Sequence, residues 1–317
     1  MLINILLLLG GFIALIYGAN ALVDAASSLA ARYGVPSIVI GLTIVAFGTS
    51  APELVVNVFA ATTGSTDMVL GNVLGSNIFN VLGILGISAL IYPLTVKSNT
   101  TWIEIPLSLL AAICVLVVAS DTMLDGTASN FISRSDGIIL LLFFLVFLVY
   151  NLMVAKSGGA DEEITTKDYS TGKAVLFIIL GLAGLVVGGR LIVTSAVSIA
   201  EVIGLSERVI GLTVVSIGTS LPELATSIIA VRKKNVDIAI GNVVGSNIFN
   251  IFLILGISGS IVPLGVNPDS FFDIIINILT GLLLFIFVFT GRGRKVERWE
   301  GAVFVIGYVA YVTYLII

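Results

Sequence analysis

The stretch GTSAPELVVN, residues 48–57, places a carboxylate, Glu53, beside a proline in an apolar run of an apolar chain. The sequence has 317 residues, of which 58% are hydrophobic and only 11% are charged. A soluble domain carries about 25% charged residues, so the composition excludes that class. The apolar runs are long enough to cross the roughly 30 Å hydrocarbon core of a bilayer, where a chain must satisfy its own backbone hydrogen bonds. We therefore predict an all-α polytopic membrane protein surrounded by the lipid bilayer.

The apolar runs predict ten membrane spans. Twelve of the 15 Lys and Arg residues lie in the loops that follow odd-numbered spans, and only Arg134 and Arg208 lie in the loops that follow even-numbered spans. Because cytoplasmic loops are rich in Lys and Arg, we expect the odd loops in the cytoplasm and both termini outside, in a cell (plasma or inner) membrane. The first run lacks a basic flank and is interpreted as a retained helix, not a signal peptide. The predicted spans are 2–27, 36–62, 68–93, 102–120, 136–155, 172–200, 206–231, 237–262, 271–290 and 300–316.

Shifted by 170 residues, the chain matches itself. GLTIVAFGTSAPEL aligns with GLTVVSIGTSLPEL, and GNVLGSNIFN aligns with GNVVGSNIFN. Over residues 41–86 and 211–256, 24 of 46 positions are identical without a gap. Each copy lies in a block of five spans, and because five is odd the second block enters the membrane from the opposite face. This predicts ten transmembrane helices in two inverted-topology repeats of five, an arrangement typical of secondary transporters, whose substrate site lies near the membrane midplane where the repeats meet.

The repeats divide the chain into three parts. The first five-helix repeat covers 1–155, a polar cytoplasmic linker covers 156–171, and the second five-helix repeat covers 172–317. The linker is interpreted as a solvated connector. The alternative is a small regulatory cation site formed by Asp161, Glu162 and Glu163.

The motif around Glu53 predicts a broken helix that carries oxygen ligands. Pro52 has no N–H and its ring clashes with the carbonyl of Gly48, so the helix should break or kink there and free the carbonyls around residues 46–49. Thr49 and Glu53 are four residues apart and share one helical face, with Ser50 beside them. The second repeat carries the same set as Ser216, Thr219, Ser220, Pro222 and Glu223.

The partner motif places polar side chains at helical spacing. Asn72, Ser76 and Asn80 are four residues apart and therefore share one face. Gly71 and Gly75 should let a neighbouring helix approach closely. The equivalent face in the second repeat carries Asn242, Ser246 and Asn250.

Two-fold symmetry should bring Glu53 and Glu223 into one site, far from any Lys or Arg. A charged residue at the centre of a membrane helix costs about 2.5–3.5 kcal/mol, which a bound cation would offset. Oxygen ligands suit hard cations, and two carboxylates neutralise one Ca²⁺, which takes six to eight oxygens. The same carbonyls and hydroxyls can instead hold Na⁺. Packing glycines, a simple proline kink and a protonated glutamate explain single residues, but not the repetition of the whole set in register.

The two pairs of motifs resemble the α-1 and α-2 repeats of the calcium/cation antiporter superfamily, in its sodium/calcium exchanger branch of prokaryotic type. The resemblance covers nearly the whole chain. It implies that Glu53 and Glu223 are the central ligands for both Ca²⁺ and Na⁺, and that the first and sixth spans slide against a rigid core. The further ligands that it implies are Thr49 and Thr219 through a carbonyl or hydroxyl, Ser50, Ser220, Ser76 and Ser246 at Na⁺ sites, the backbone carbonyls of Ala46 and Ser216, and Asn80 and Asn250 facing the centre.

Two features of the sequence bear on which ion drives transport. Asn250 stands where potassium-dependent members of the superfamily carry Asp, which argues against K⁺ transport. The proton/calcium branch tends to place Glu in the helix that begins with Gly-Asn, whereas this chain has apolar, Gly, Ser or Asn residues there. Both features favour Na⁺. An antiporter of H⁺ and Ca²⁺, or of another divalent cation, at the same site stays open.

The predicted function is Ca²⁺ export driven by the Na⁺ gradient through alternating access. An enzyme is disfavoured, because acid–base pairs need different environments and these two acids are symmetry mates. A passive channel is the remaining class. No cofactor and no nucleic acid are expected, and a monomer is sufficient. Asp24 and Arg190 lie late in the first and sixth spans, which run in opposite directions, so we expect them near opposite membrane faces and unable to pair with each other. Each is interpreted as a snorkelling side chain, and the alternative is a role at the edge of a gate.

Overall fold

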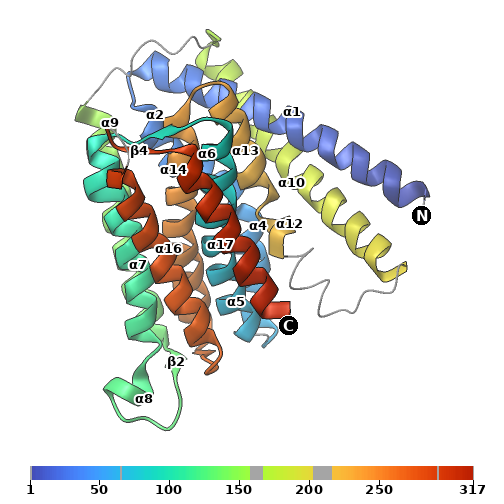
Figure 1. The fold of residues 1–317 in the computed structure, drawn as a ribbon. Helices are drawn as coiled ribbons and strands as arrows, with labels where there is room; N and C mark the ends of the chain where they lie inside the picture. The colour runs from blue at the N-terminus through green and yellow to red at the C-terminus, as the bar shows by residue number, and fades with distance from the viewer. Residues whose placement is uncertain (1, 65, 158–166, 203–215, 291–292, 317) are drawn as a thin grey trace.

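A computed structural model describes residues 2–64, 66–157, 167–202, 216–290 and 293–316, and it is built almost entirely from helices (Figure 1). In the first half the elements are α1 Leu2–Tyr33, α2 Ser37–Ile40, η1 Gly41–Val45, α3 Ala46–Thr49, α4 Ala51–Thr62, α5 Thr66–Ile78, η2 Phe79–Leu85, α6 Gly86–Ile91, β1 Leu94–Thr95, η3 Thr100–Glu104, α7 Ile105–Val118, α8 Asp121–Leu124, β2 Phe131–Ile132 and α9 Arg134–Ser157, where η marks a π-helical segment. In the second half they are α10 Thr171–Val202, α12 Ser216–Thr219, α13 Leu221–Arg232, α14 Val236–Ile248, η5 Phe249–Leu255, α15 Gly256–Ile261, β3 Leu264–Gly265, α16 Ser270–Thr290, β4 Lys295–Val296 and α17 Arg298–Ile316.

The all-helical prediction is confirmed. Among the described residues seven helices are long and apolar enough to cross a membrane, and an eighth span results if the bent pair Ser37–Thr49 and Ala51–Thr62 is counted as one. Of the other two predicted spans, 300–316 corresponds to α17, and 206–231 lies partly outside the described residues. The first helix ends at Tyr33, six residues beyond the predicted end of the first span, because the small residues after position 24 pack against other helices instead of forming a loop.

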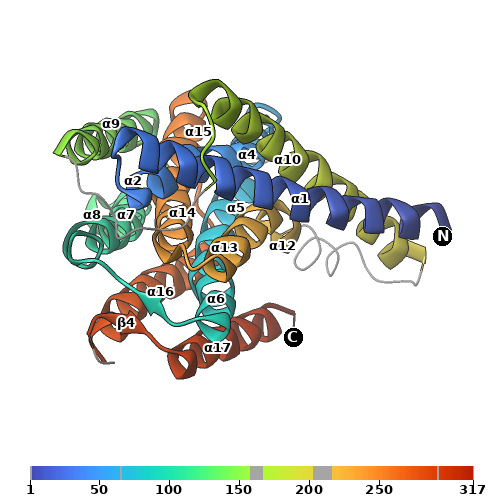
Figure 2. The same ribbon diagram turned by 90° about the horizontal axis from the view of Figure 1, so that it is seen from above.

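The two helices that carry the Gly-Asn motifs form the centre of the molecule. The continuous helices are 66–91 (α5, η2 and α6) and 236–261 (α14, η5 and α15). In the most apolar 18-residue stretch of each helix, 78% and 94% of the stretch is buried inside the protein. Figure 2 shows α5 and α14 inside a ring that includes α1, α9, α10, α16 and α17. The polar residues of both motifs are therefore held away from lipid by the surrounding helices.

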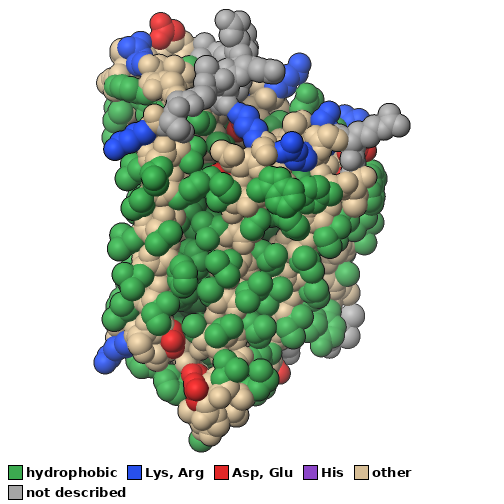
Figure 3. Space-filling view, turned by 90° about the vertical axis from the view of Figure 1, so that its left-hand side faces the viewer, with side chains coloured by type: hydrophobic (Ala, Val, Ile, Leu, Met, Phe, Trp, Pro, Cys, Tyr) green, Lys and Arg blue, Asp and Glu red, His purple; other side chains and the backbone are tan. Residues whose placement is uncertain are grey.

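Two short antiparallel strand pairs mark opposite ends of the molecule. β1 pairs with β4, with Leu94 opposite Val296, and β2 pairs with β3, with Phe131 opposite Gly265. In Figure 1 β4 lies at the top and β2 at the bottom. We call the top the β1–β4 end and the bottom the β2–β3 end. On the face drawn in Figure 3, most Lys and Arg side chains gather at the β1–β4 end. The loops that carry β1 and β4 both follow odd-numbered predicted spans, and those that carry β2 and β3 both follow even-numbered ones. Each strand pair therefore joins two loops predicted on the same side of the membrane.

Glycines allow α1 and α10 to pack along each other, as Figure 2 shows. A Cβ atom added at Gly18 would lie 2.8 Å from the carbonyl oxygen of Gly181, and one added at Gly11 would lie 2.9 Å from that of Gly188. Real Cβ contacts are longer than 3.0 Å, so the two backbones approach as closely as only glycine permits. The first and sixth predicted spans thus form one closely packed pair.

We expect Gly18→Ala to destabilise the protein by about 1–3 kcal/mol, because the added methyl group must push α1 away from α10. Gly10→Ala is the matched control on the same helix, since no described atom lies within 4 Å of its added Cβ. Thermal unfolding in detergent measures the difference. Equal unfolding temperatures for the two variants would contradict the close packing of α1 and α10.

Candidate functional site

The helix break predicted at Pro52 is present. α3 ends at Thr49, α4 begins at Ala51, and the two helices are bent by 48° at Ser50, whose φ and ψ are −86° and 5°. Proline cannot donate to the carbonyl four residues earlier, so the helix loses a hydrogen bond there. The carbonyl of Ala46 is not free, however, because it accepts from the N–H of Ser50 at 2.9 Å and from Thr49 Oγ1 at 3.3 Å. The prediction of freed carbonyls is therefore wrong for Ala46.

The second repeat breaks in the same way. α12 ends at Thr219 and α13 begins at Leu221, with φ and ψ of −90° and 9° at Ser220. Glu53 and Glu223 thus occupy the first turn of α4 and α13, where the partial positive charge of a helix N-terminus favours a carboxylate. Both acids are almost fully enclosed, with exposures of 2% and 1%.

Each break places its serine on the acid of the other repeat. Ser50 Oγ donates to Glu223 Oε1 at 2.9 Å, and Ser220 Oγ donates to Glu53 Oε1 at 3.5 Å. The serines also lie across from the Gly-Asn helices, since Ser50 Oγ is 2.9 Å from Ser246 Oγ and Ser220 Oγ is 3.4 Å from Ser76 Oγ. A hydroxyl has one proton, so each break serine can donate to only one of its two neighbours at a time. The four serines and two acids therefore form two groups of three, Ser50 with Glu223 and Ser246, and Ser220 with Glu53 and Ser76.

Four asparagines connect the two central helices. The amide N–H₂ of Asn77 donates to the carbonyl of Asn247 at 3.3 Å, and that of Asn247 donates to the carbonyl of Asn77 at 3.4 Å. Asn80 Nδ2 donates to Asn247 Oδ1 and Asn250 Nδ2 donates to Asn77 Oδ1, both at 2.9 Å. Asn80 and Asn250 lie in the π-helical segments η2 and η5, and such segments are frequent at functional sites. The outer pair, Asn77 and Asn247, thus fixes the orientation of the inner pair.

The enclosed group leaves several acceptor atoms without a donor. Glu53 Oε2, Glu223 Oε2, Asn80 Oδ1 and Asn250 Oδ1 are buried and accept no hydrogen bond from the described residues. A buried polar atom without a partner costs about 1–3 kcal/mol, and a bound cation would satisfy such oxygens. Carboxylate and amide oxygens suit Na⁺ and Ca²⁺ in hardness. Within the described part of the chain no cluster contains three or more His, Cys, Asp or Glu side chains.

The structure brings most of the predicted site residues together. Thr49 Oγ1 lies 3.0 Å from Asn242 Oδ1, within the same polar region. Thr219 lines an adjoining cavity. Ser216 begins α12, but its side chain lies outside the described part of the chain. The residues joined directly to the acids, the serine pairs or the asparagine network are Ser50, Glu53, Ser76, Asn80, Ser220, Glu223, Ser246 and Asn250.

Three residues of this region were missing from the predicted ligand set. Asn77 and Asn247 were missed because the prediction kept only residues spaced four apart, and these asparagines come one residue after Ser76 and Ser246. Both nevertheless lie in the repeated sequence SNIFN. Asn242 was assigned to that face but not to the ligand set. Its amide donates to the carbonyl of Glu223 at 3.2 Å and to Ser227 Oγ at 3.0 Å, so it supports the first turn of α13.

The glycines of the two Gly-Asn motifs have different surroundings. A Cβ added at Gly241 would lie 2.8 Å from the carbonyl of Ile38, and one at Gly245 would lie 2.8 Å from the Cβ of Ala46, so α14 packs tightly against α2, η1 and α3. No described atom lies within 4 Å of a Cβ added at Gly71 or Gly75. No described helix therefore makes the predicted close approach to Gly71 and Gly75. The segment equivalent to the one that packs on Gly241 and Gly245 is 208–216, which lies mostly outside the described residues.

The β1–β4 end is closed by polar contacts between α1 and the turn that follows α13. Lys233 Nζ lies 2.7 Å from Asp24 Oδ1, and Asn235 Nδ2 donates to Ser27 Oγ at 2.8 Å. Lys167, in the linker, also pairs with Asp24 at 2.9 Å, and this hydrogen bond raises the pKa of the lysine above its ordinary value. Asp24 therefore pairs with lysines at its own end and not with Arg190, as predicted.

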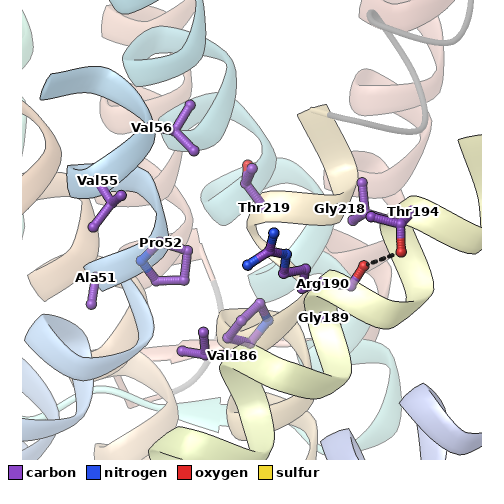
Figure 4. A pocket seen from close by; sticks show the side chains of 12 residues that line it. Ala51, Pro52, Val55, Val56, Val186, Gly189, Arg190, Thr194, Gly218 and Thr219 are labelled. Carbon is purple, nitrogen blue, oxygen red and sulfur yellow. Dashed lines mark hydrogen bonds between the residues drawn. The ribbon is translucent and has the colours of Figure 1, made fainter. Parts of the chain in front are cut away.

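A cavity of about 450 Å³ adjoins the two helix breaks on their other side (Figure 4). Pro52 and Pro222, which precede the two acids, lie in its wall. Arg190 lies there too, so the expectation that the acids are far from every basic residue is wrong for this side chain, although no described carboxylate pairs with it. The full lining is Ala51, Pro52, Val55, Val56, Val186, Gly189, Arg190, Val193, Thr194, Gly218, Thr219 and Pro222.

Comparison with known proteins identifies the class. The family model described as sodium/calcium exchanger protein matches residues 3–153 and 173–317, so the chain belongs to this family of membrane transporters. It is 37% identical over 324 residues to inner membrane protein YrbG of Escherichia coli (strain K12), covering 99% of this chain and 97% of that protein. It is 35% identical over 349 residues to sodium/calcium exchanger MaX1 of Methanosarcina acetivorans, covering 99% and 98% of the two chains.

The fold matches solved structures of an exchanger. The structure of the sodium-calcium exchanger NCX_Mj soaked with 10 mM Na⁺ and zero Ca²⁺ aligns with a TM-score of 0.83 and 32% identity over 99% of both chains. The chain is therefore a multi-pass membrane transporter and not an enzyme, and ions are the substrates of its family rather than cofactors.

We expect Asn247→Leu to weaken Ca²⁺ binding by about 10- to 100-fold, as is usual when a residue that orients a ligand is lost. The substitution leaves the amide of Asn80 without its acceptor, so Asn80 Oδ1 is no longer held in place. Asn151→Leu is the matched control, because this buried amide donates within its own helix, to Phe147. Calorimetric titration with Ca²⁺ measures both variants, and unchanged binding by Asn247→Leu would contradict the orienting role.

Proposed function

We propose that the protein exchanges Na⁺ for Ca²⁺ across the membrane, exporting Ca²⁺ with the energy of the Na⁺ gradient. The observation that carries the proposal is the set of buried, donor-free oxygens on Glu53, Glu223, Asn80 and Asn250. Two carboxylates balance the charge of one Ca²⁺, and the two amide oxygens bring the ligand set toward the six to eight oxygens that Ca²⁺ prefers.

Na⁺ ions would use the oxygens around the same acids. The contacts Ser50–Ser246 and Ser220–Ser76 bring two hydroxyls together beside each carboxylate. One serine pair lies beside each acid, so the site would hold either several Na⁺ ions or one Ca²⁺ ion, but not both at once. The remaining proposed Na⁺ ligands are Thr49, Thr219 and the backbone carbonyls of Ser216 and Ala46, of which the Ala46 oxygen would use a second lone pair while it accepts from the N–H of Ser50.

The chain would be organised as ten spans in two inverted repeats, 1–155 and 172–317, joined by the linker 156–171. The crosswise hydrogen bonds support this organisation. Ser50 contacts Glu223, and the residues equivalent to these two in the other repeat, Ser220 and Glu53, also contact each other. The asparagine contacts obey the same shift. In an inverted repeat, each contact that closes one side of the site can be replaced by the equivalent contact on the other side. Alternating access would use this exchange.

Access would alternate through movement of the α1–α10 pair against the central helices. Polar contacts and close glycine packing join this pair and α2 to the core at the β1–β4 end, while a cavity adjoins the site from the other side. The β1–β4 end would be cytoplasmic and both termini outside, as the distribution of Lys and Arg predicts.

We expect Glu53→Gln and Glu223→Gln each to reduce Na⁺-driven Ca²⁺ uptake into proteoliposomes by about 100-fold or more, since even residues behind the ligands are worth 10- to 100-fold. Glu104→Gln is the matched control: this glutamate is equally buried, but its partner is Tyr150, away from the breaks. Replacing the Na⁺ gradient by a pH gradient distinguishes the driving ions. Uptake that follows the pH gradient and ignores Na⁺ would replace this proposal by an H⁺/Ca²⁺ antiporter at the same site.

A further inference from the structure

The cavity of about 450 Å³ adjoins both helix breaks. Its wall includes Thr219 and the two prolines that precede the acids, so it reaches the backbone of both helix breaks. A second cavity of about 330 Å³ shares Val55 and Val56 with it and continues along α4 to Thr63. The two cavities together lead from the breaks toward the β2–β3 end, where α5, which follows α4, contacts β3.

Arg190 places a positive charge in this cavity. Figure 4 shows its guanidinium directed into the space between Pro52 and Thr219. The helix is fixed there on both sides of the arginine, since a Cβ added at Gly189 would lie 3.7 Å from Pro222 and one added at Gly218 would lie 2.2 Å from Val193. Among the described residues no carboxylate lies within the 4.0 Å of an ion pair with Arg190. Its charge is therefore not neutralised by a described neighbour.

The surroundings strengthen the effect of that charge. Most of the other lining side chains are aliphatic, with Thr194 and Thr219 as the hydroxyl-bearing exceptions. Electric fields in a cleft with low-dielectric walls extend further than in bulk water and alter the rate at which ions arrive. The guanidinium of Arg190, although exposed, lies in the wall of this cavity beside Thr219 and the two prolines, so a cation in the cavity lies within its field.

We propose that Arg190 is a selectivity residue that slows the capture of divalent cations more than that of monovalent cations. The electrostatic work of passing a fixed charge is proportional to the charge of the ion. A potential that slows Na⁺ by about twofold to threefold therefore slows Ca²⁺ by the square of that factor, about fourfold to tenfold. The arginine would thus favour Na⁺ on this side, where the proposed exchanger must load Na⁺ and release Ca²⁺.

The potential in the cavity can be measured without any transport. Val56→Cys, made in a Cys114→Ser background, places one thiol in the cavity wall, and its rates of reaction with a trimethylammonium and a sulfonate methanethiosulfonate reagent report the local potential. Adding Arg190→Gln should shift the ratio of the two rates toward the cationic reagent by about fourfold to tenfold, because the reagents differ by two unit charges. A shift below about twofold, or a thiol that neither reagent reaches, would overturn the inference.

The consequence for ions rests on the proposed exchange function and is measured separately. In proteoliposomes at fixed ionic strength, Arg190→Gln should raise kcat/KM for Ca²⁺ by about fourfold to tenfold, while Arg190→Lys stays within about twofold of the natural protein. Lys173→Gln, at the other end of α10, controls for charge on the helix in general. Equal behaviour of the Gln and Lys variants, or unchanged kcat/KM in both, would overturn the role of the charge. Absence of Ca²⁺ transport by the natural protein would instead overturn the exchange function, and the thiol ratio would still report the potential.

Discussion

Two buried carboxylates without a basic partner are the constraint on which the rest of the structure depends. A bilayer core penalises each charge, and the described residues supply hydroxyls and amides but no cation to the acids. The helix breaks and the crossed serines act on this problem. The serines hold one oxygen of each acid by a hydrogen bond and leave the other free. Two enclosed oxygens, Glu53 Oε2 and Glu223 Oε2, that accept no hydrogen bond from described residues fit the proposed binding of a positive ion.

The same constraint accounts for the difference between the two ends of the molecule. Binding inside a bilayer is useful for transport only if one side of the site is closed while the other is reachable. At the β1–β4 end α14 packs tightly on η1 and Lys233 contacts Asp24, which would close this side in the proposed cycle. The serine and asparagine contacts occur in pairs related by a shift of 170 residues. The asymmetry lies in the helices around these contacts, chiefly the α1–α10 pair.

Internal repetition made much of this architecture predictable. A motif that occurs twice in register indicated that Glu53 and Glu223 lie together, and the serine of each motif does contact the acid of the other. What the sequence did not reveal depended on geometry beyond the α-helix: Asn77 and Asn247 face the partner helix next to π-helical segments, whereas steps of four select only Asn80 and Asn250. Arg190 was expected near a membrane face, whereas it lies twelve residues before the end of α10 and beside the prolines of both breaks, because its position depends on where α10 lies against them.

The central claim is that a cation binds between the two free carboxylate oxygens. Crystals grown with Ca²⁺, and compared with crystals washed free of it, test this claim most directly through the anomalous signal of the ion. The account predicts one site whose ligands include Glu53, Glu223 and at least one of the inner asparagines, with six or more oxygens at about 2.3–2.6 Å. A Ca²⁺ site elsewhere, or two glutamates that hydrogen-bond to each other through a shared proton at saturating Ca²⁺, would contradict it.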